Sequence, residues 1–95
     1  MERNEPLPLY LVTHRGELAV NDNELIASRA IRDHAAGPLV ESLVEMTHHQ
    51  AQLLGRMVNV LEVTPAPAGD FAADGGAIVH IADDGSWHRP HDGEQ

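Results

Sequence analysis

The chain has 95 residues, which is enough for one small domain that buries only about 60–70% of its unfolded surface. It contains no cysteine, which excludes disulfides, thiolate metal sites and a cysteine nucleophile. Its net charge is −9 and its six basic residues are all arginine, so direct binding to nucleic-acid phosphates is not expected.

The remaining composition restricts the location and the core. No run of 18 apolar residues occurs, and the start, "MERNEPLPLY", has acids and prolines where a signal peptide needs a basic and then an apolar segment. We therefore expect a cytoplasmic protein, or one inside an assembled particle, with no membrane partner and no cleavable signal. The three aromatic residues, Tyr10, Phe71 and Trp87, leave a mainly aliphatic core.

The first two predicted elements are a strand or β-hairpin over residues 7–20 and a helix over residues 23–36. In the first, two apolar runs flank "HRGE", where Gly16 suits a turn. In the second, polar caps precede Glu24 in the first turn, and Gly37 supplies the stop signal.

A long second helix is predicted over residues 38–63, because Pro38 suits a first helical position and the apolar periodicity continues to Thr64. It would be about 39 Å long and would pair with the first helix in an α+β fold. Spacing of four and three residues along it defines a coiled-coil-like seam: Leu39, Leu43, Met46, Gln50, Leu53, Met57 and Val60.

The seam predicts self-association. A second apolar row runs beside it, so the apolar face is wider than one partner helix covers, and a symmetric homo-oligomer buries the remainder. Gln50 interrupts the seam, where it either fixes the register across a symmetry axis or lies at a solvated edge. Both alternatives stay open.

The C-terminal third is predicted to be a linker over residues 64–76, a strand or hairpin over residues 77–89 and an acidic tail over residues 90–95. Pro, Ala and Gly dominate the linker, and a tight two-residue turn is expected at Asp84–Gly85. Residues 64–95 hold six acids and one arginine, a net charge of −5.

Two groups of side chains are candidate metal ligands. Glu41, Glu45 and His48 would share a helix face, and Glu45 with His48 matches the four-residue Glu-x-x-His element of di-iron bundles. This face points away from the apolar rows, which favours a solvated surface over a site.

The other candidate group is His80, His88 and His91, whose imidazoles suit zinc or nickel. A two-residue turn would place His80 and His88 on opposite faces of the hairpin, which argues against this site. No cofactor is therefore expected from either group.

No pattern selects a catalytic group. The serines are Ser28, Ser42 and Ser86; none lies in a predicted strand-to-helix elbow, and no glycine-rich phosphate loop occurs.

The sequence favours a non-enzymatic assembly or adaptor protein, a structural component of a larger particle such as a virion or shell, whose partners are itself and another protein. The alternatives are an acidic inhibitor that mimics nucleic acid and binds a basic protein, and a metal-binding helical protein that uses Glu45 and His48.

Overall fold

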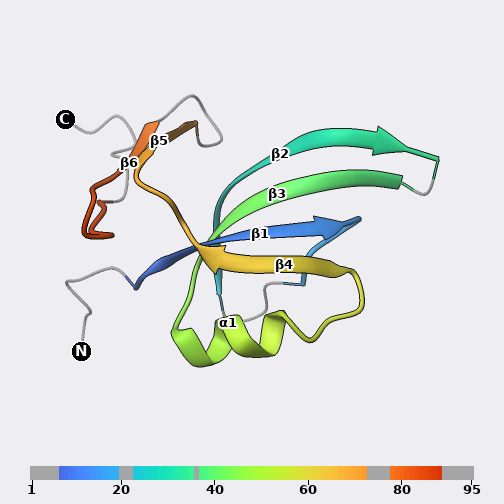
Figure 1. The fold of residues 1–95 in the computed structure, drawn as a ribbon, viewed down its shortest axis with the longest axis horizontal. Helices are drawn as coiled ribbons and strands as arrows, with labels where there is room; N and C mark the ends of the chain where they lie inside the picture. The colour runs from blue at the N-terminus through green and yellow to red at the C-terminus, as the bar shows by residue number, and fades with distance from the viewer. Residues whose placement is uncertain (1–6, 20–22, 36, 73–77, 89–95) are drawn as a thin grey trace.

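The computed structural model describes residues 7–19, 23–35, 37–72 and 78–88. Four of its strands form one antiparallel sheet in the order β2-β3-β1-β4, and two more form a small antiparallel sheet (Figure 1). The elements in chain order are β1 (Leu9–Arg15), β2 (Glu24–His34), β3 (Gly37–Glu45), α1 (His48–Leu54), β4 (Val60–Pro65), β5 (Gly69–Ala72) and β6 (Ile78–Ile81).

The predicted α+β fold with a helix–helix pair and a long second helix is wrong, because the described residues are mostly in β-strands and include one short helix. The predicted coiled-coil-like helix is wrong for the same reason. No helix in the described part of the chain has the length and apolar composition needed to cross a membrane.

Residues 24–34 form a strand although their Ala, Leu, Glu and Arg content favours a helix. The strand hydrogen-bonds with β3 along its length, and this pairing overrides the local propensity. The pairing skips Ile26 and Ile31, so β2 carries two bulges. These extra residues break the alternation of two that would otherwise have identified a strand.

The predicted helix over 38–63 is divided into β3, α1 and β4. Residues 42–45 at the end of β3 and Met46 directly after it are all buried, because β3 is a central strand covered on both faces. An apolar run of this kind fits helix and strand periodicity equally well.

The true helix begins at Thr47, whose hydroxyl accepts the backbone N–H of Gln50 at 3.1 Å. The Gln50 side chain in turn accepts the Thr47 N–H at 2.8 Å, which completes a capping box. Gln50 therefore stabilises a helix N-terminus and is not part of a seam.

The two faces of the four-stranded sheet carry separate apolar clusters. On one face, α1 lies across β1 and β4 and contributes Ala51 and Leu54 to a cluster with Val12, Val44 and Met46 (Figure 1). The opposite face packs against the β5–β6 hairpin through Leu9, Ala27, Leu43, Val79, Ile81 and Trp87.

The ends of the chain agree only in part with the prediction. A strand lies at β1, but its partners are β3 and β4, so the expected hairpin over 7–20 is absent from the described residues. The expected linker contains β5. The expected C-terminal hairpin is present, since β6 is followed by a bridge between Ile81 and Trp87.

Candidate functional site

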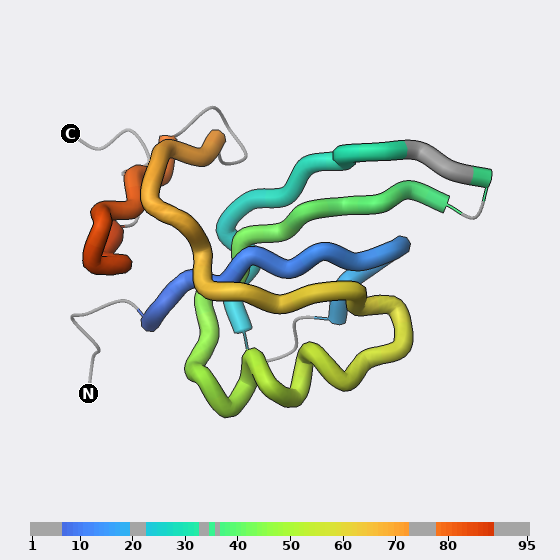
Figure 2. The backbone as a smooth tube through the Cα atoms, in the orientation of Figure 1, coloured from blue at the N-terminus to red at the C-terminus, as the bar shows by residue number. Residues whose placement is uncertain are grey.

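The outer edge of β2 is the longest exposed strand edge in the described part of the chain. β2 has 11 residues, lies at one end of the sheet order, and pairs only with β3 among the described residues. It curves with β3 into a hairpin that projects beyond β1 and β4 (Figure 2). Leu25 and Ile31 on this strand are 43% and 42% exposed. A long edge with exposed aliphatic side chains is a template for pairing with another strand.

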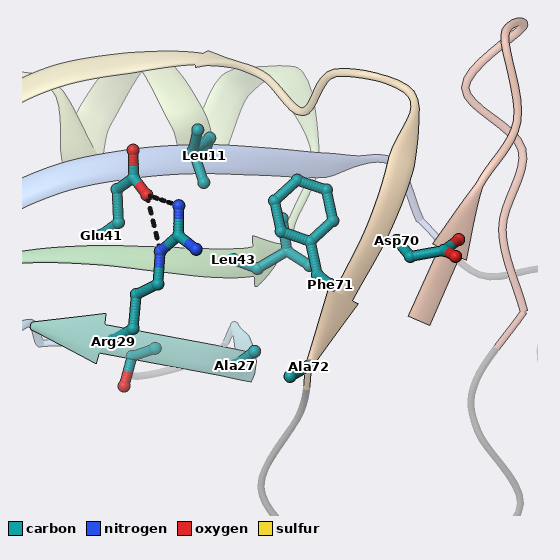
Figure 3. Close-up of a pocket in the computed structure, with 9 residues that line it drawn as sticks. Leu11, Ala27, Arg29, Glu41, Leu43, Asp70, Phe71 and Ala72 are labelled. Atoms are coloured by element: carbon teal, nitrogen blue, oxygen red, sulfur yellow. Dashed lines mark hydrogen bonds and ion pairs between the residues drawn. The ribbon is translucent and has the colours of Figure 1, made fainter. Parts of the chain in front are cut away.

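A groove of about 400 Å³ lies beside this edge, between the sheet and β5 (Figure 3). Leu11, Leu43 and Phe71 supply its apolar wall, and the Phe71 ring lies next to Leu43. Ala27, Ser28 and Arg29 of β2 also line it, so the groove and the strand edge form one continuous surface.

An ion pair defines the polar end of the groove. The Arg29 guanidinium donates to the same Glu41 carboxylate oxygen through Nε at 3.1 Å and Nη2 at 2.9 Å. The Arg29 side chain is 70% exposed and that of Glu41 22%, so the pair contributes at most about 1 kcal/mol of stability. Its main effect is to hold both side chains across the β2–β3 pair, as the dashed lines in Figure 3 show.

A second hollow of about 550 Å³ lies between α1 and β4. Tyr10, Leu61 and Val63 line it together with polar Gln52 and Arg56. The adjoining edge strand, β4, is short and ends at Pro65, which has no N–H to offer a further strand. This edge is therefore a poorer template for strand pairing than β2.

His14 and Ser42 form a buried hydrogen-bonded pair on the helix-facing side of the sheet. The Ser42 hydroxyl is 2.7 Å from His14 Nε2, and His14 Nδ1–H donates to the Gly16 carbonyl at 3.0 Å. His14 is 3% exposed and Ser42 2%. A substrate has no access to a pair at this depth, so we assign it a structural role.

The His14–Ser42 pair makes stability depend on pH. Burial lowers the pKa of His14 from its ordinary value of 6.5, while the hydrogen bond to Gly16 acts in the opposite direction. The folded state thus prefers the neutral ring, and the free energy of unfolding should be highest above pH 6.5 and should fall as the pH drops towards the lowered pKa. Urea unfolding followed over about pH 5–8 measures this slope.

Two variants separate His14 from the other histidines. His14→Gln removes the titrating ring and should reduce the pH slope, whereas His49→Gln removes an exposed histidine of α1 and should keep the wild-type slope. Equal slopes in wild type and His14→Gln would contradict the assignment.

The first predicted group of metal ligands does not converge. Glu41 pairs with Arg29 on the face of the sheet that packs against the β5–β6 hairpin. Glu45 is 4% exposed at the end of β3, and its carboxylate accepts the Leu7 N–H at 2.8 Å. His48 lies in α1, where Nδ1 is 3.4 Å from the Tyr10 hydroxyl. The prediction that these three side chains share a face depended on a helix over residues 38–63, which the structure divides into β3, α1 and β4.

The C-terminal hairpin places its histidines differently from the prediction. The Gly85 N–H donates to Ala82 O and the Ala82 N–H to Ser86 O, both at 2.9 Å, with Gly85 at φ 90°. The loop therefore has three residues, and His88 falls opposite His80 in the register set by Ile81 and Trp87.

His80 nevertheless interacts with a different side chain, that of Asp70. Its Nδ1 is 2.6 Å from the Asp70 carboxylate on the neighbouring strand, and Asp70 points towards β6 (Figure 3). No group of three metal-ligating side chains occurs within residues 7–19, 23–35, 37–72 and 78–88, and His91 lies outside these ranges.

The acids of the C-terminal third that the structure describes are Asp70, Asp83 and Asp84. Asp84 accepts the Ser86 N–H at 3.0 Å and its hydroxyl at 2.7 Å, and these bonds lower the pKa of Asp84. They stabilise the hairpin loop.

The predicted seam residues fall in separate elements. Leu39 and Leu43 belong to β3, Gln50 and Leu53 to α1, and Val60 to β4. Met46 is fully buried and Met57 packs against the same cluster. Of the seven, Leu53 is the large aliphatic residue that stays half exposed, at 49%.

Sequence reasoning missed both the β2 edge and the buried pair. Ser42 was considered only as an isolated nucleophile, and its partner His14 lies 28 residues away on another strand. A usable signal was the "TxxQ" at residues 47–50, which marks a helix start and so implies that the preceding run is a separate element.

Comparison of the chain with protein-family models, curated proteins and solved structures gives no match.

Proposed function

We propose that the protein is a non-enzymatic building block that associates with another copy of itself through the outer edge of β2. The observation that carries this proposal is the 11-residue edge strand with Leu25 and Ile31 exposed on it. Backbone groups on such an edge provide the hydrogen bonds of association, and the aliphatic side chains provide the buried apolar area.

Two side-chain pairs of the described residues resemble parts of catalytic sites, and neither supplies an argument for enzymatic activity. Among the described residues, the hydrogen-bonded serine–histidine pair is buried, and the Asp70–His80 pair lies on an exposed strand with no nucleophile bonded to it. The role proposed is assembly, in which the dimer is one unit of a larger particle.

A closed dimer follows from the difference between the two sheet edges. β4 offers six residues and ends in proline, whereas β2 offers 11. Pairing of β2 with β2 uses the same surface on both copies, so it closes after two chains, and the joined sheet then ends in a β4 edge on each side.

Light scattering on the purified chain over a range of concentrations tests the proposal. We expect the mass of a dimer for the wild type and a shift to monomer for Ile31→Lys, because a charged side chain then enters the interface. Leu53→Lys is the matched control, since Leu53 is about equally exposed but lies on α1.

Circular dichroism establishes that each variant keeps the wild-type fold. A monomeric wild type would overturn the proposal. A dimer that Ile31→Lys leaves intact and Leu53→Lys dissociates would also overturn it, and would place the interface at the hollow between α1 and β4.

A further inference from the structure

An antiparallel pairing of β2 with itself can take only a few registers. A two-fold axis that continues the sheet stands perpendicular to it and places one residue directly opposite its own copy. Each symmetric register is therefore identified by its central residue. Near the middle of β2 the candidates are residues 27–30.

The register centred on Ser28 matches the side chains of the two copies. Counted by the β3 residues with which they pair, it places Glu24 opposite Arg32 of the second copy and Leu25 opposite Ala30, and the symmetry repeats both pairs. Opposite charges and aliphatic pairs in direct opposition each stabilise an antiparallel sheet. The exposed Leu25 side chain is thus covered by the second copy.

The neighbouring registers lack this match. Centring on Arg29 places two arginines in direct opposition, which is destabilising. Centring on Ala30 places Arg29 opposite Arg32, which is a like-charge pair. Centring on Ala27 places Glu24 opposite Arg29, whose guanidinium is already bonded to Glu41.

The two bulges keep Glu24 and Arg32 on the same face of the sheet. One skipped residue lies on each side of Ser28, Ile26 two residues before it and Ile31 three residues after it, so Glu24 and Arg32 stay equally far from Ser28 along β3. Glu24 pairs with Glu45 and Arg32 with Leu39 on β3, and these partners are six positions apart. Because side chains alternate along a strand, both lie on one face of the sheet.

We infer that two copies join through β2 about a two-fold axis at Ser28, with Glu24 and Arg32 paired across the interface. This inference rests on the proposed function and specifies its partner and register. It produces an eight-stranded sheet and brings the two grooves together on one face. Arg29 of the second copy falls opposite Ala27 and borders the groove that Ala27 lines.

A single cysteine tests the register, because the chain has no cysteine of its own. In the Ser28 register the two Cα atoms at position 28 lie about 4.5–5.5 Å apart, within the roughly 4.4–6.8 Å range of a disulfide. Ser28→Cys should form a covalent dimer under mild oxidation. Ala30→Cys, the matched control on the same strand, would lie about 13 Å from its copy and should not.

A charge exchange tests the pairing of Glu24 with Arg32. Glu24→Arg and Arg32→Glu should each weaken the dimer about tenfold, because each creates two like-charge pairs. The double variant should return to within about twofold of the wild-type affinity. Two weakened single variants without recovery in the double variant would overturn the assigned pairing.

The crosslinking and light-scattering results test the register and the proposed interface separately. A dimer in which Ala30→Cys crosslinks and Ser28→Cys does not would overturn the register and leave the β2 interface standing. A wild type that is monomeric by light scattering would overturn the interface and the register together.

Discussion

Replacing Leu43 with alanine is expected to lower the free energy of unfolding by about 2–5 kcal/mol, whereas replacing Leu53 with alanine should change it by less than about 1 kcal/mol. Leu43 is 2% exposed on the central strand β3 and packs in the cluster with Leu9 and Trp87. Its truncation leaves a cavity in that cluster. Leu53 is half exposed on α1.

This pair of variants distinguishes the structure from the helix that the sequence predicts. In that helix, Leu43 and Leu53 are equivalent members of one seam, so their truncation should cost similar amounts. Urea unfolding followed by circular dichroism measures both. Equal losses at the two positions would contradict the placement of residue 43 in a buried strand.

The second large effect is expected at Trp87. The residue is 4% exposed, bridges to Ile81, and donates Nε1–H to the Leu7 carbonyl at 2.7 Å. It therefore ties the C-terminal hairpin to the start of the chain and to the sheet. Trp87→Ala should lower the free energy of unfolding by about 3–5 kcal/mol, since it removes both the packing and the bond.

Trp87→Phe is the matched variant because it keeps an aromatic ring and removes the N–H donor. Its expected cost is about 1–3 kcal/mol, which corresponds to an unpaired Leu7 carbonyl and a smaller ring. Circular dichroism is the suitable measurement, because Trp87 is the single tryptophan of the chain. A phenylalanine variant as unstable as the alanine variant would show that the hydrogen bond dominates.

The groove between the sheet and β5 also depends on Trp87. Phe71 forms its wall on β5, and β5 pairs with β6, which Trp87 follows through the bridge at Ile81. The β2 edge, in contrast, is held by its pairing with β3. Loss of the Trp87 anchor should thus disturb the groove before it disturbs the proposed dimer interface.

The sequence predicts self-association through a helical seam in residues 38–63, and the structure divides these residues into β3, α1 and β4. Leu43 and Met46 are buried in the protein's own core, and Gln50 caps the helix. The exposed aliphatic residues on β2, Leu25 and Ile31, lie in the segment that the sequence predicts as the first helix, residues 23–36. The proposal therefore keeps the function and moves the interface from residues 38–63 to residues 24–34.

The sequence by itself determined the features that depend on composition and on local backbone geometry. These are the lack of disulfides, the acidic and mostly aliphatic character, the strand near Leu9, and the C-terminal hairpin with Gly85 in its loop. A turn or a helix cap is specified by a few adjacent residues, so local patterns can identify it.

The tertiary structure alone decided that β2 and β3 are strands. A helix makes its hydrogen bonds within the segment, so local propensity and periodicity describe it. A strand makes them with distant segments: Leu9 pairs with Glu45, and Val12 pairs with both Ser42 and Val63. Residues 24–45 satisfied the local pattern of helices. Pairing of β3 with β1, which buries His14 and Ser42 together, and of β2 with β3 required the strand conformation.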